Sequence, residues 1–239
     1  AEQDPVDAEA AYLAPMRRRT PDVAAQLVGV ATSRRGLRAS VRLEVLKYVR
    51  SQATPSGSFR QLLLLRGPPG VGKTAWAREQ VDLHMGLTDE GEQRVARCAH
   101  ICSVDDFFAR ARIGDSGEVV DEDVFKASEL EAAHAWNEAR AQLAMELGLQ
   151  PLYIDAMNLQ LWEMAPYVAA AVKAGYEVSF VQPADVFGGW DDVGALAARS
   201  AGRQPPRAPC PASQLRELIG ALEPLPAGAP GDDAALRAV

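Results

Sequence analysis

One short segment, Gly67-Pro-Pro-Gly-Val-Gly-Lys-Thr74, constrains the fold of this chain more than any other. It matches the full pattern Gly-x-x-x-x-Gly-Lys-Ser/Thr, in which a glycine-rich loop joins a buried strand to a helix. The apolar run Gln61-Leu-Leu-Leu-Leu-Arg66 precedes it, and a segment with helical character from Val71 to His84 follows. The sequence therefore predicts a phosphate-binding loop at the carboxyl end of a buried strand.

Each residue type in this loop has a chemical reason. The three glycines permit backbone conformations that point successive amides inward, and the N-terminus of the following helix adds positive potential to the same anion site. The lysine is expected to reach the β and γ phosphates, and the threonine to ligate Mg²⁺. The expected cofactors are ATP or GTP with Mg²⁺. The predicted nucleotide site consists of Gly67, Gly70, Gly72, Lys73, Thr74 and Ala75.

Strands and helices alternate after the loop. Short apolar runs predict further strands at 97–103, 151–155 and 177–182. Helical spacing predicts helices at about 122–148, 162–174, 192–200 and 212–222. This order implies an α/β fold with a doubly wound parallel sheet, whose ligands bind at the carboxyl ends of the strands.

Composition divides the chain into three parts. Residues 1–58 form an N-terminal extension with the cluster Arg17-Arg18-Arg19 and a helical pattern from Ser40 to Arg50. Residues 59–222 form the nucleotide-binding domain, and residues 223–239 form a Pro/Gly/Ala-rich tail. We expect the extension and the tail to contact protein partners or the back of the core.

The net charge of −7 is distributed unevenly along the chain. Residues 1–60 hold ten Lys/Arg and six Asp/Glu, whereas residues 61–239 hold fifteen and twenty-six. Long nucleic acid is bound mainly by Lys and Arg that neutralise phosphates, so the acidic region argues against extensive nucleic-acid contact. A local basic groove, and with it a nucleic-acid partner, stays open as an alternative.

Three cysteines, Cys98, Cys102 and Cys210, cannot form a disulfide framework. We therefore expect an intracellular reducing compartment, either the cytoplasm or the mitochondrial matrix. No apolar run approaches the roughly 20 residues that a membrane-spanning helix needs. Cys98, His100 and Cys102 alternate along the predicted second strand, and we interpret them as packing residues because the paired spacing of zinc ligands is missing.

Two carboxylate motifs follow predicted strands. Ser103-Val-Asp105-Asp106 ends the second strand, where adjacent carboxylates are typical either of a solvated turn or of a base that accepts a hydroxyl proton. Asp155 ends the third strand, where it is either a turn residue or a carboxylate that holds Mg²⁺ directly or through water. Spacing alone leaves both pairs of alternatives open. On the long predicted helix, His134, Trp136 and Asn137 are more typical of packing than of chemistry.

Over residues 61–200 the chain resembles the polynucleotide-kinase-like and zeta-toxin-like P-loop kinases, and within them the NEDD-four-binding-protein-two-like branch. The matching blocks lie at 62–74, 103–108, 133–140 and 154–167. The resemblance implies a P-loop kinase fold, with Asp105 as the base toward the acceptor hydroxyl. It also implies that Arg199 belongs to an Arg-rich lid that closes over the transferring phosphoryl group. For Asp155, its position at a strand end leads us to favour the Mg²⁺ carboxylate over the turn residue.

Two departures from the family pattern define the competing hypotheses. Asp155-Ala156-Met157-Asn158 stands where the family usually has Asp-Asn-Thr-Asn, and prolines interrupt the lid between residues 203 and 211. The leading hypothesis is a kinase that transfers the γ-phosphoryl group to a polynucleotide 5′-hydroxyl or a small molecule, with Asp105, Lys73 and Arg199 as catalytic residues. The alternative is a catalytically idle nucleotide-binding subunit of a larger, organellar complex.

Overall fold

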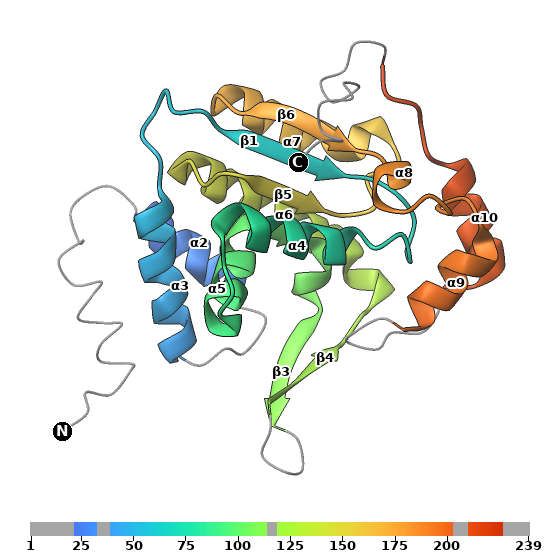
Figure 1. Cartoon of the computed structure of the whole chain (residues 1–239), viewed down its shortest axis with the longest axis horizontal. Helices are drawn as coiled ribbons and strands as arrows, with labels where there is room; N and C mark the ends of the chain where they lie inside the picture. Colours follow the sequence, from blue (N-terminus) through green and yellow to red (C-terminus); the bar gives the residue numbers. More distant parts are fainter. Residues whose placement is uncertain (1–21, 33–38, 114–118, 203–209, 227–239) are drawn as a thin grey trace.

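A computed structural model describes residues 22–32, 39–113, 119–202 and 210–226, with backbone only at residues 39, 111–113 and 119–123 (Figure 1). Its central sheet has four parallel strands in the order β2-β5-β1-β6. The strands are β1 (Gln61–Leu65), β2 (Ile101–Ser103), β5 (Leu152–Asp155) and β6 (Glu177–Val181). This confirms the predicted α/β fold with a parallel sheet of the P-loop kinase type.

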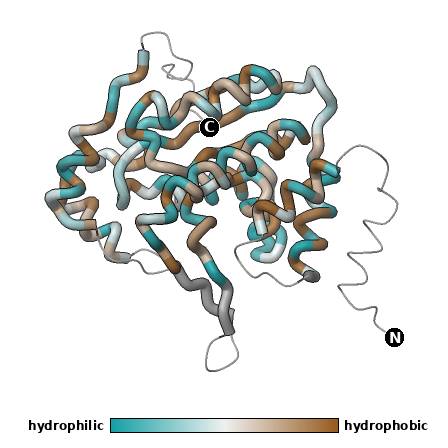
Figure 2. The backbone as a smooth tube through the Cα atoms, turned by 180° about the vertical axis from the view of Figure 1, so that it is seen from behind, coloured by the Kyte–Doolittle hydropathy of each residue, from teal (hydrophilic) through white to brown (hydrophobic). Residues whose placement is uncertain are grey.

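Helices cover both faces of this sheet, which explains why β1 is apolar at consecutive positions. Leu62 and Leu64 point into one hydrophobic core, and Leu63 and Leu65 point into the other. The first core contains α6 (Leu130–Leu147) and α7 (Leu161–Lys173), and the second contains α4 (Lys73–Met85). Seen from behind, hydrophobic and hydrophilic stretches alternate along these helices (Figure 2).

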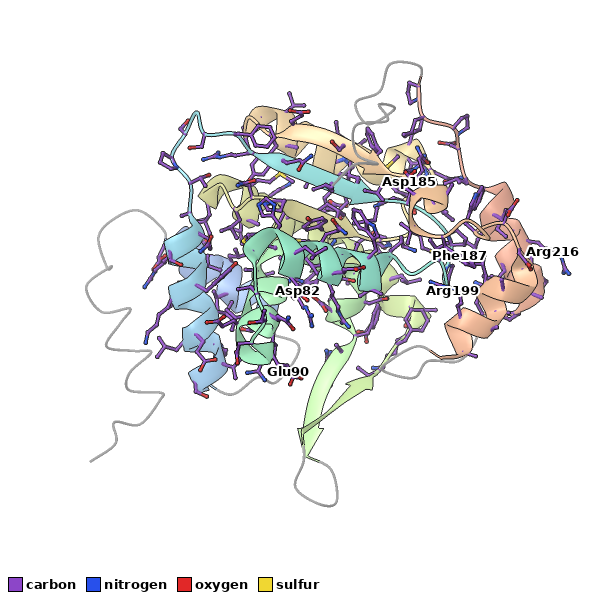
Figure 3. All side chains as sticks on the ribbon, viewed as in Figure 1. Asp82, Glu90, Asp185, Phe187, Arg199 and Arg216 are labelled. Atoms are coloured by element: carbon purple, nitrogen blue, oxygen red, sulfur yellow. The ribbon has the colours of Figure 1, made fainter. Side chains whose placement is uncertain are left out.

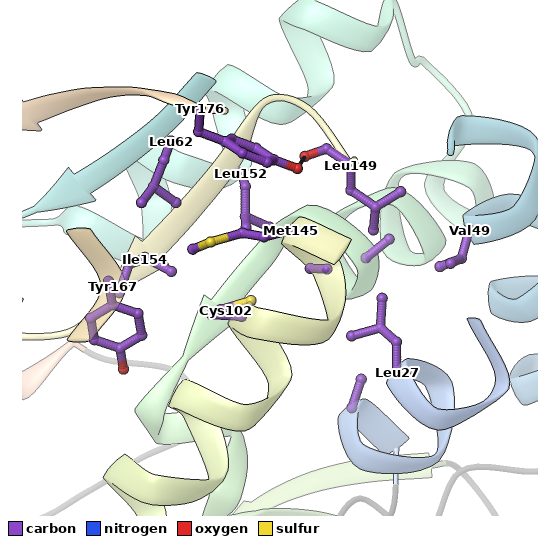
Figure 4. Close-up of a cluster of buried hydrophobic side chains, with 14 of the residues drawn as sticks. Leu27, Val49, Leu62, Cys102, Met145, Leu149, Leu152, Ile154, Tyr167 and Tyr176 are labelled. Carbon is purple, nitrogen blue, oxygen red and sulfur yellow. Dashed lines mark hydrogen bonds between the residues drawn. The ribbon is translucent and has the colours of Figure 1, made fainter. Parts of the chain in front are cut away.

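Two N-terminal helices, α2 (Val23–Thr32) and α3 (Ala39–Gln52), belong to the first core. Leu27 from α2 and Val49 from α3 are buried together with Met145 of α6 and with Leu149 (Figure 4). The hydroxyl of Tyr176 donates to the Leu149 carbonyl at 2.7 Å at the edge of this cluster. The described part of the predicted extension thus packs on the domain itself, while residues 1–21 lie outside the described residues.

The predicted second strand was wrong in its first part. Residues 97–100 belong to α5 (Glu90–His100), which begins where the Asp89 carboxylate accepts from the Glu92 amide at 2.9 Å. Four residues of α5, Val95, Ala96, Cys98 and Ala99, are buried at helical spacing and so favour helix over strand. Cys98 and His100 therefore do not share a strand face with Cys102.

His100 ends α5 as a buried polar group with two partners. Its Nδ1 lies 2.7 Å from the Pro151 carbonyl, and its Nε2 lies 3.0 Å from the Tyr48 hydroxyl. Burial lowers the pKa of His100 to about 4. The side chain thus bridges α3, α5 and the start of β5, which is a packing role.

The long predicted helix was also wrong at its start. α6 begins at Leu130, and Val119–Asp123 instead forms strand β4, paired antiparallel with β3 (Ala109–Ile113). This hairpin projects from the body of the molecule, directly after the short turn η2 (Val104–Phe107) (Figure 1). A second short turn, η3 (Ala127–Glu129), leads into α6.

After β6, the described residues form three short helices. They are α8 (Pro183–Val186), α9 (Val193–Ala201) and α10 (Ala212–Gly220). α9 and α10 confirm two predicted helices, and Leu196 and Leu215 join them to Val71 of the glycine loop in one apolar cluster. Most of the proline-interrupted stretch lies outside the described residues. Among the described helices, none has the length and hydropathy required to span a membrane.

Candidate nucleotide site

The glycine loop follows β1 and leads into α4, as predicted, although α4 begins at Lys73, two residues after the predicted start at Val71. Gly70 and Gly72 have φ values of 90° and 105°, in the left-handed region that favours glycine. A Cβ at Gly70 would lie 2.4 Å from the Leu196 carbonyl oxygen, and one at Gly72 would lie 2.8 Å from a guanidinium nitrogen of Arg199. The backbone conformation therefore favours glycine at both positions, and the close approach of the α9 backbone requires it at Gly70.

Lys73 and Thr74 open helix α4 from the mouth of the loop. The Lys73 ammonium donates to the Gly67 carbonyl at 2.7 Å and to the Pro68 carbonyl at 3.2 Å. Thr74 and the exposed Ala75 follow in the first helical turn, whose backbone amides have no intrahelical partners. This end of α4 thus presents amides and an ammonium group to a single anion site.

Asp155, at the end of β5, connects the end of β2 to the start of α4. It is 5% exposed, and its Oδ2 accepts from the Thr74 hydroxyl at 2.7 Å and from the Ser103 hydroxyl at 3.2 Å. Burial raises the pKa of Asp155, whereas the Lys73 charge and the two hydroxyl hydrogen bonds lower this pKa, and the Asp105 charge raises it further. A buried carboxylate beside two hydroxyl oxygens suits a hard cation such as Mg²⁺.

No group of three or more His, Cys, Asp or Glu side chains in the described residues is arranged to hold a metal ion. Mg²⁺ in nucleotide sites usually takes only one or two carboxylates and completes its shell with phosphates and water. Thr74 and Asp155 therefore fit a magnesium ion that arrives with a nucleotide.

The structure separates the two adjacent carboxylates of η2. Asp106 forms an ion pair of 2.7 Å with Arg140, which is fully buried and also donates to the Cys98 carbonyl at 2.7 Å. Asp105 is the member whose charge acts on Asp155. Asp106 therefore holds η2 against α6, and Asp105 lies with Lys73 and Asp155 at the carboxyl edge of the sheet.

Two of the predicted packing residues of α6, Trp136 and Asn137, connect this helix to α2, β2 and α7. The Trp136 indole donates to the Val30 carbonyl of α2 at 3.1 Å. The Asn137 amide donates to the Cys102 carbonyl at 3.3 Å and to the Tyr167 hydroxyl at 3.0 Å. These side chains satisfy buried polar groups around the strand that carries Asp105 into the site.

The loop after β5 is tied to the start of the glycine loop. The Gly67 amide donates to the Met157 carbonyl at 2.8 Å, and the Asn158 amide group donates to the Leu65 carbonyl at 2.8 Å. Asn158 has a φ of 48°, a left-handed conformation that Asn tolerates better than most residues. Ala156 is buried in an apolar cluster with Phe107 and other residues of the η2 region, which explains an apolar residue at this position.

Arg199 of α9 lies on the glycine loop but contacts its carbonyl side. Its Nε donates to the Gly70 carbonyl at 2.9 Å, and a terminal nitrogen donates to the Val71 carbonyl at 3.2 Å. The guanidinium carbon stacks 4.2 Å from the centre of the Phe187 ring (Figure 3). The predicted lid residue thus connects α9 to the loop.

Sequence reasoning missed Arg66, the residue immediately before the loop. It is 1% exposed, and its guanidinium donates to the carbonyls of Asn158, Leu159 and Glu223 at 3.0, 3.0 and 2.7 Å. Burial lowers the pKa of Arg66. No local pattern identifies this role, because its partners lie more than 90 residues away along the chain.

Comparisons with known proteins agree with this geometry. The sequence profile of the AAA domain matches residues 62–225, which is more than half of the chain. NEDD4-binding protein 2 from Homo sapiens is 38% identical over 122 residues, which are 51% of this chain and 6% of that protein. The chain thus corresponds to a small part of this relative, and no solved structure matches it significantly. With its glycine loop, parallel sheet and strand-end carboxylate, the chain belongs to the AAA domain family of P-loop, nucleotide-binding proteins.

Proposed function

We propose that this protein is a kinase that transfers the γ-phosphoryl group of ATP or GTP to a hydroxyl group. The observation that carries the proposal is the convergence of Lys73, Thr74 and Asp155 with a second carboxylate, Asp105, at one edge of the sheet. A nucleotide site needs the first three, but a base beside them is needed only for transfer. The similarity to NEDD4-binding protein 2 supports membership of that branch.

The glycine loop and α4 bind the nucleotide. Backbone amides and the helix N-terminus hold the β and γ phosphates, and Lys73 exchanges the Gly67 and Pro68 carbonyls for phosphate oxygens, which are stronger acceptors for an ammonium group. Thr74 and Asp155 would hold Mg²⁺, which would supply positive charge to neutralise the phosphates. Arg199 likewise exchanges loop carbonyls for phosphoryl oxygens.

Asp105 acts on the acceptor. Its carboxylate takes the proton of the acceptor hydroxyl as that oxygen bonds to the γ phosphorus and the bond to the β-phosphate oxygen breaks. The products are a phosphate ester and a nucleoside diphosphate. Lys73 stabilises the negative charge that develops on the transferring group. The acceptor is a polynucleotide 5′-hydroxyl or a small alcohol.

A second candidate function is a nucleotide-binding subunit without turnover. It is favoured by the position of Arg199, which is hydrogen bonded to loop carbonyls, and by the apolar residues Ala156 and Met157 beside the site. This candidate predicts that bound nucleotide is retained intact.

One assay separates the two candidates. The purified chain is incubated with γ-labelled ATP or GTP, Mg²⁺ and a panel of 5′-hydroxyl oligonucleotides and small alcohols, with EDTA and the Lys73→Ala variant as controls. Transfer to any acceptor that EDTA and Lys73→Ala abolish supports the kinase. Nucleotide that binds but is never transferred or hydrolysed overturns it in favour of the second candidate.

A further inference from the structure

The proposed chemistry does not use the buried guanidinium of Arg66. It contacts the carbonyls of Asn158, Leu159 and Glu223, and a terminal nitrogen lies 3.3 Å from the side-chain oxygen of Gln182. A guanidinium with so little exposure requires acceptors for its donors, because an uncompensated buried charge is costly. Arg66 therefore ties together three segments that are distant in sequence, next to the first glycine of the loop.

One of these segments follows α10 and is here called the C-terminal strap, residues 221–226. The Glu223 amide donates to the Leu159 carbonyl at 2.9 Å, and the Glu223 carboxylate accepts from the Leu161 amide at 2.8 Å. Leu225 packs against the first hydrophobic core. Backbone, side chain and packing contacts thus all fix the strap at the start of α7.

The strap makes a second connection between the glycine loop and helices α9 and α10, which are here called the lid helices. The first connection is made by α9, whose residues Leu196 and Arg199 lie against Gly70 and Val71 of the glycine loop. The second connection follows α10, where the strap begins and the Glu223 carbonyl accepts a hydrogen bond from Arg66. The described lid helices are therefore anchored both to the middle of the phosphate-binding loop and to the residue that precedes it.

Arg66 also lies where the start of the glycine loop contacts the loop after β5. It is bonded to Gly67, whose amide donates to the Met157 carbonyl, and its own Nε donates to the next carbonyl in that loop, Asn158. The same loop follows directly on Asp155. A shift of Arg66 would consequently move the entry of the phosphate-binding loop relative to the carboxylate at the Mg²⁺ site.

We propose that Arg66 and the C-terminal strap are positioning elements of the nucleotide site, so that the affinity for nucleoside triphosphate depends on strap docking. The inference rests on the nucleotide binding of the proposed function, but not on phosphoryl transfer. When the strap is removed, Arg66 loses an acceptor and the loop spends less time in its binding-competent geometry. Apparent affinity falls in proportion to the competent fraction, so a fall of that fraction to about one tenth weakens binding about tenfold.

Two truncations of the full chain form a matched pair. Deletion of residues 223–239 removes the Glu223 carbonyl and Leu225, whereas deletion of residues 227–239 keeps both. We expect the longer deletion to raise the Kd for Mg-ATP about tenfold in calorimetry, and the shorter one to change it less than about twofold. Inorganic tripolyphosphate should lose affinity by the same factor as ATP, because the loop holds the phosphates.

Thermal melts of the nucleotide-free proteins separate positioning from simple loss of fold. If both truncations fold and bind Mg-ATP equally well, or if ATP alone loses affinity and tripolyphosphate does not, the proposal is wrong. If the longer deletion does not fold, Glu223→Ala and Glu223→Gln decide. The Ala variant loses the acceptor for the Leu161 amide and should bind about threefold more weakly, whereas the Gln variant keeps an acceptor and should bind as the wild type does.

The same pair of measurements distinguishes failure of this inference from failure of the proposed function. If the untruncated chain binds neither ATP, GTP nor tripolyphosphate, the proposed nucleotide site itself is wrong. If the untruncated chain binds these ligands and the longer deletion folds and binds them equally well, only the positioning role of Arg66 and the strap is wrong.

Discussion

The two halves of the proposed active site are built in different ways. The donor half, residues 67–75, is one continuous stretch whose ligands are mainly backbone amides, so its shape follows from the local sequence. The acceptor half combines η2, α6 and the loop after β5, and depends on side-chain pairs such as Asp106–Arg140. A binding site for a common ligand can thus be specified locally, whereas selection of an acceptor requires long-range contacts.

The largest effect is expected for Lys73→Ala, which tests the donor half. It removes the ammonium group over the loop while leaving the backbone amides in place. Loss of two charge-assisted contacts should weaken Mg-ATP binding about a thousandfold, ~4 kcal/mol. Calorimetric titration measures this directly, with the exposed Lys47→Ala on α3 as the control. Unchanged affinity of the Lys73→Ala variant for Mg-ATP would show that residues 67–75 are not the nucleotide site.

Asp106→Asn tests the structural side of the acceptor half. It leaves the fully buried Arg140 without its ion-pair partner, so unfolding free energy should fall by about 3 kcal/mol. Urea denaturation measures the change. A double variant, Asp106→Asn with Arg140→Met, should recover part of the loss because the uncompensated charge is gone. A variant as stable as the wild type would show that the pair does not hold η2.

Asp105→Asn tests the chemical side of the same half. If Asp105 is the base, its loss should slow transfer about a hundredfold and leave Mg-ATP affinity unchanged, since proton acceptance belongs to the transition state. Single-turnover rates at saturating nucleotide are the appropriate measurement. Asp106→Asn differs in that it should lower the unfolding free energy, whereas Asp105→Asn should leave the unfolding free energy close to that of the wild type. Equal transfer rates in wild type and Asp105→Asn would refute the assignment.

The smallest effect is expected for Asp155→Asn, at the border between the halves. Burial of this carboxylate costs free energy in the nucleotide-free protein, and Asn keeps an acceptor for Thr74 and Ser103. The nucleotide-free variant should therefore be more stable by about 1 kcal/mol and should lose the extra stabilisation that Mg²⁺ adds to bound nucleotide. Thermal melts with and without Mg-ATP test both, with the exposed Asp191→Asn as the control. If nucleotide-free Asp155→Asn is less stable than the wild type, burial of the Asp155 carboxylate does not destabilise the nucleotide-free protein.

The sequence predicted the fold where the pattern is local and continuous. β1, the glycine loop and α4 follow from consecutive residues, and α7 and α9 follow from helical spacing. It misassigned residues 97–100 because Cys98 and His100 alternate with Cys102, while helix packing against the core decided their structure. It missed the β3–β4 hairpin because pairing between strands depends on register, which composition does not show.

The site was predictable to the same degree. The loop motif identified Lys73 and Thr74, and their proximity to Asp155 is present in the structure. Spacing did not distinguish Asp105 from Asp106, because the distinction depends on Arg140, 34 residues away. Arg66 escaped prediction for a similar reason, since an arginine at the end of a strand has no pattern that reveals whether it is buried.

The packing of α2 and α3 has a consequence for how this domain varies in evolution. Family similarity begins at residue 62, but the described hydrophobic core already includes Ala24, with Leu27 and Val49 buried in the same cluster as residues of α6. A relative could keep every phosphate-binding residue and replace this N-terminal cover by an unrelated segment, provided that it shields the same apolar face. A protein started at β1 would instead expose that face to water and tend to self-associate.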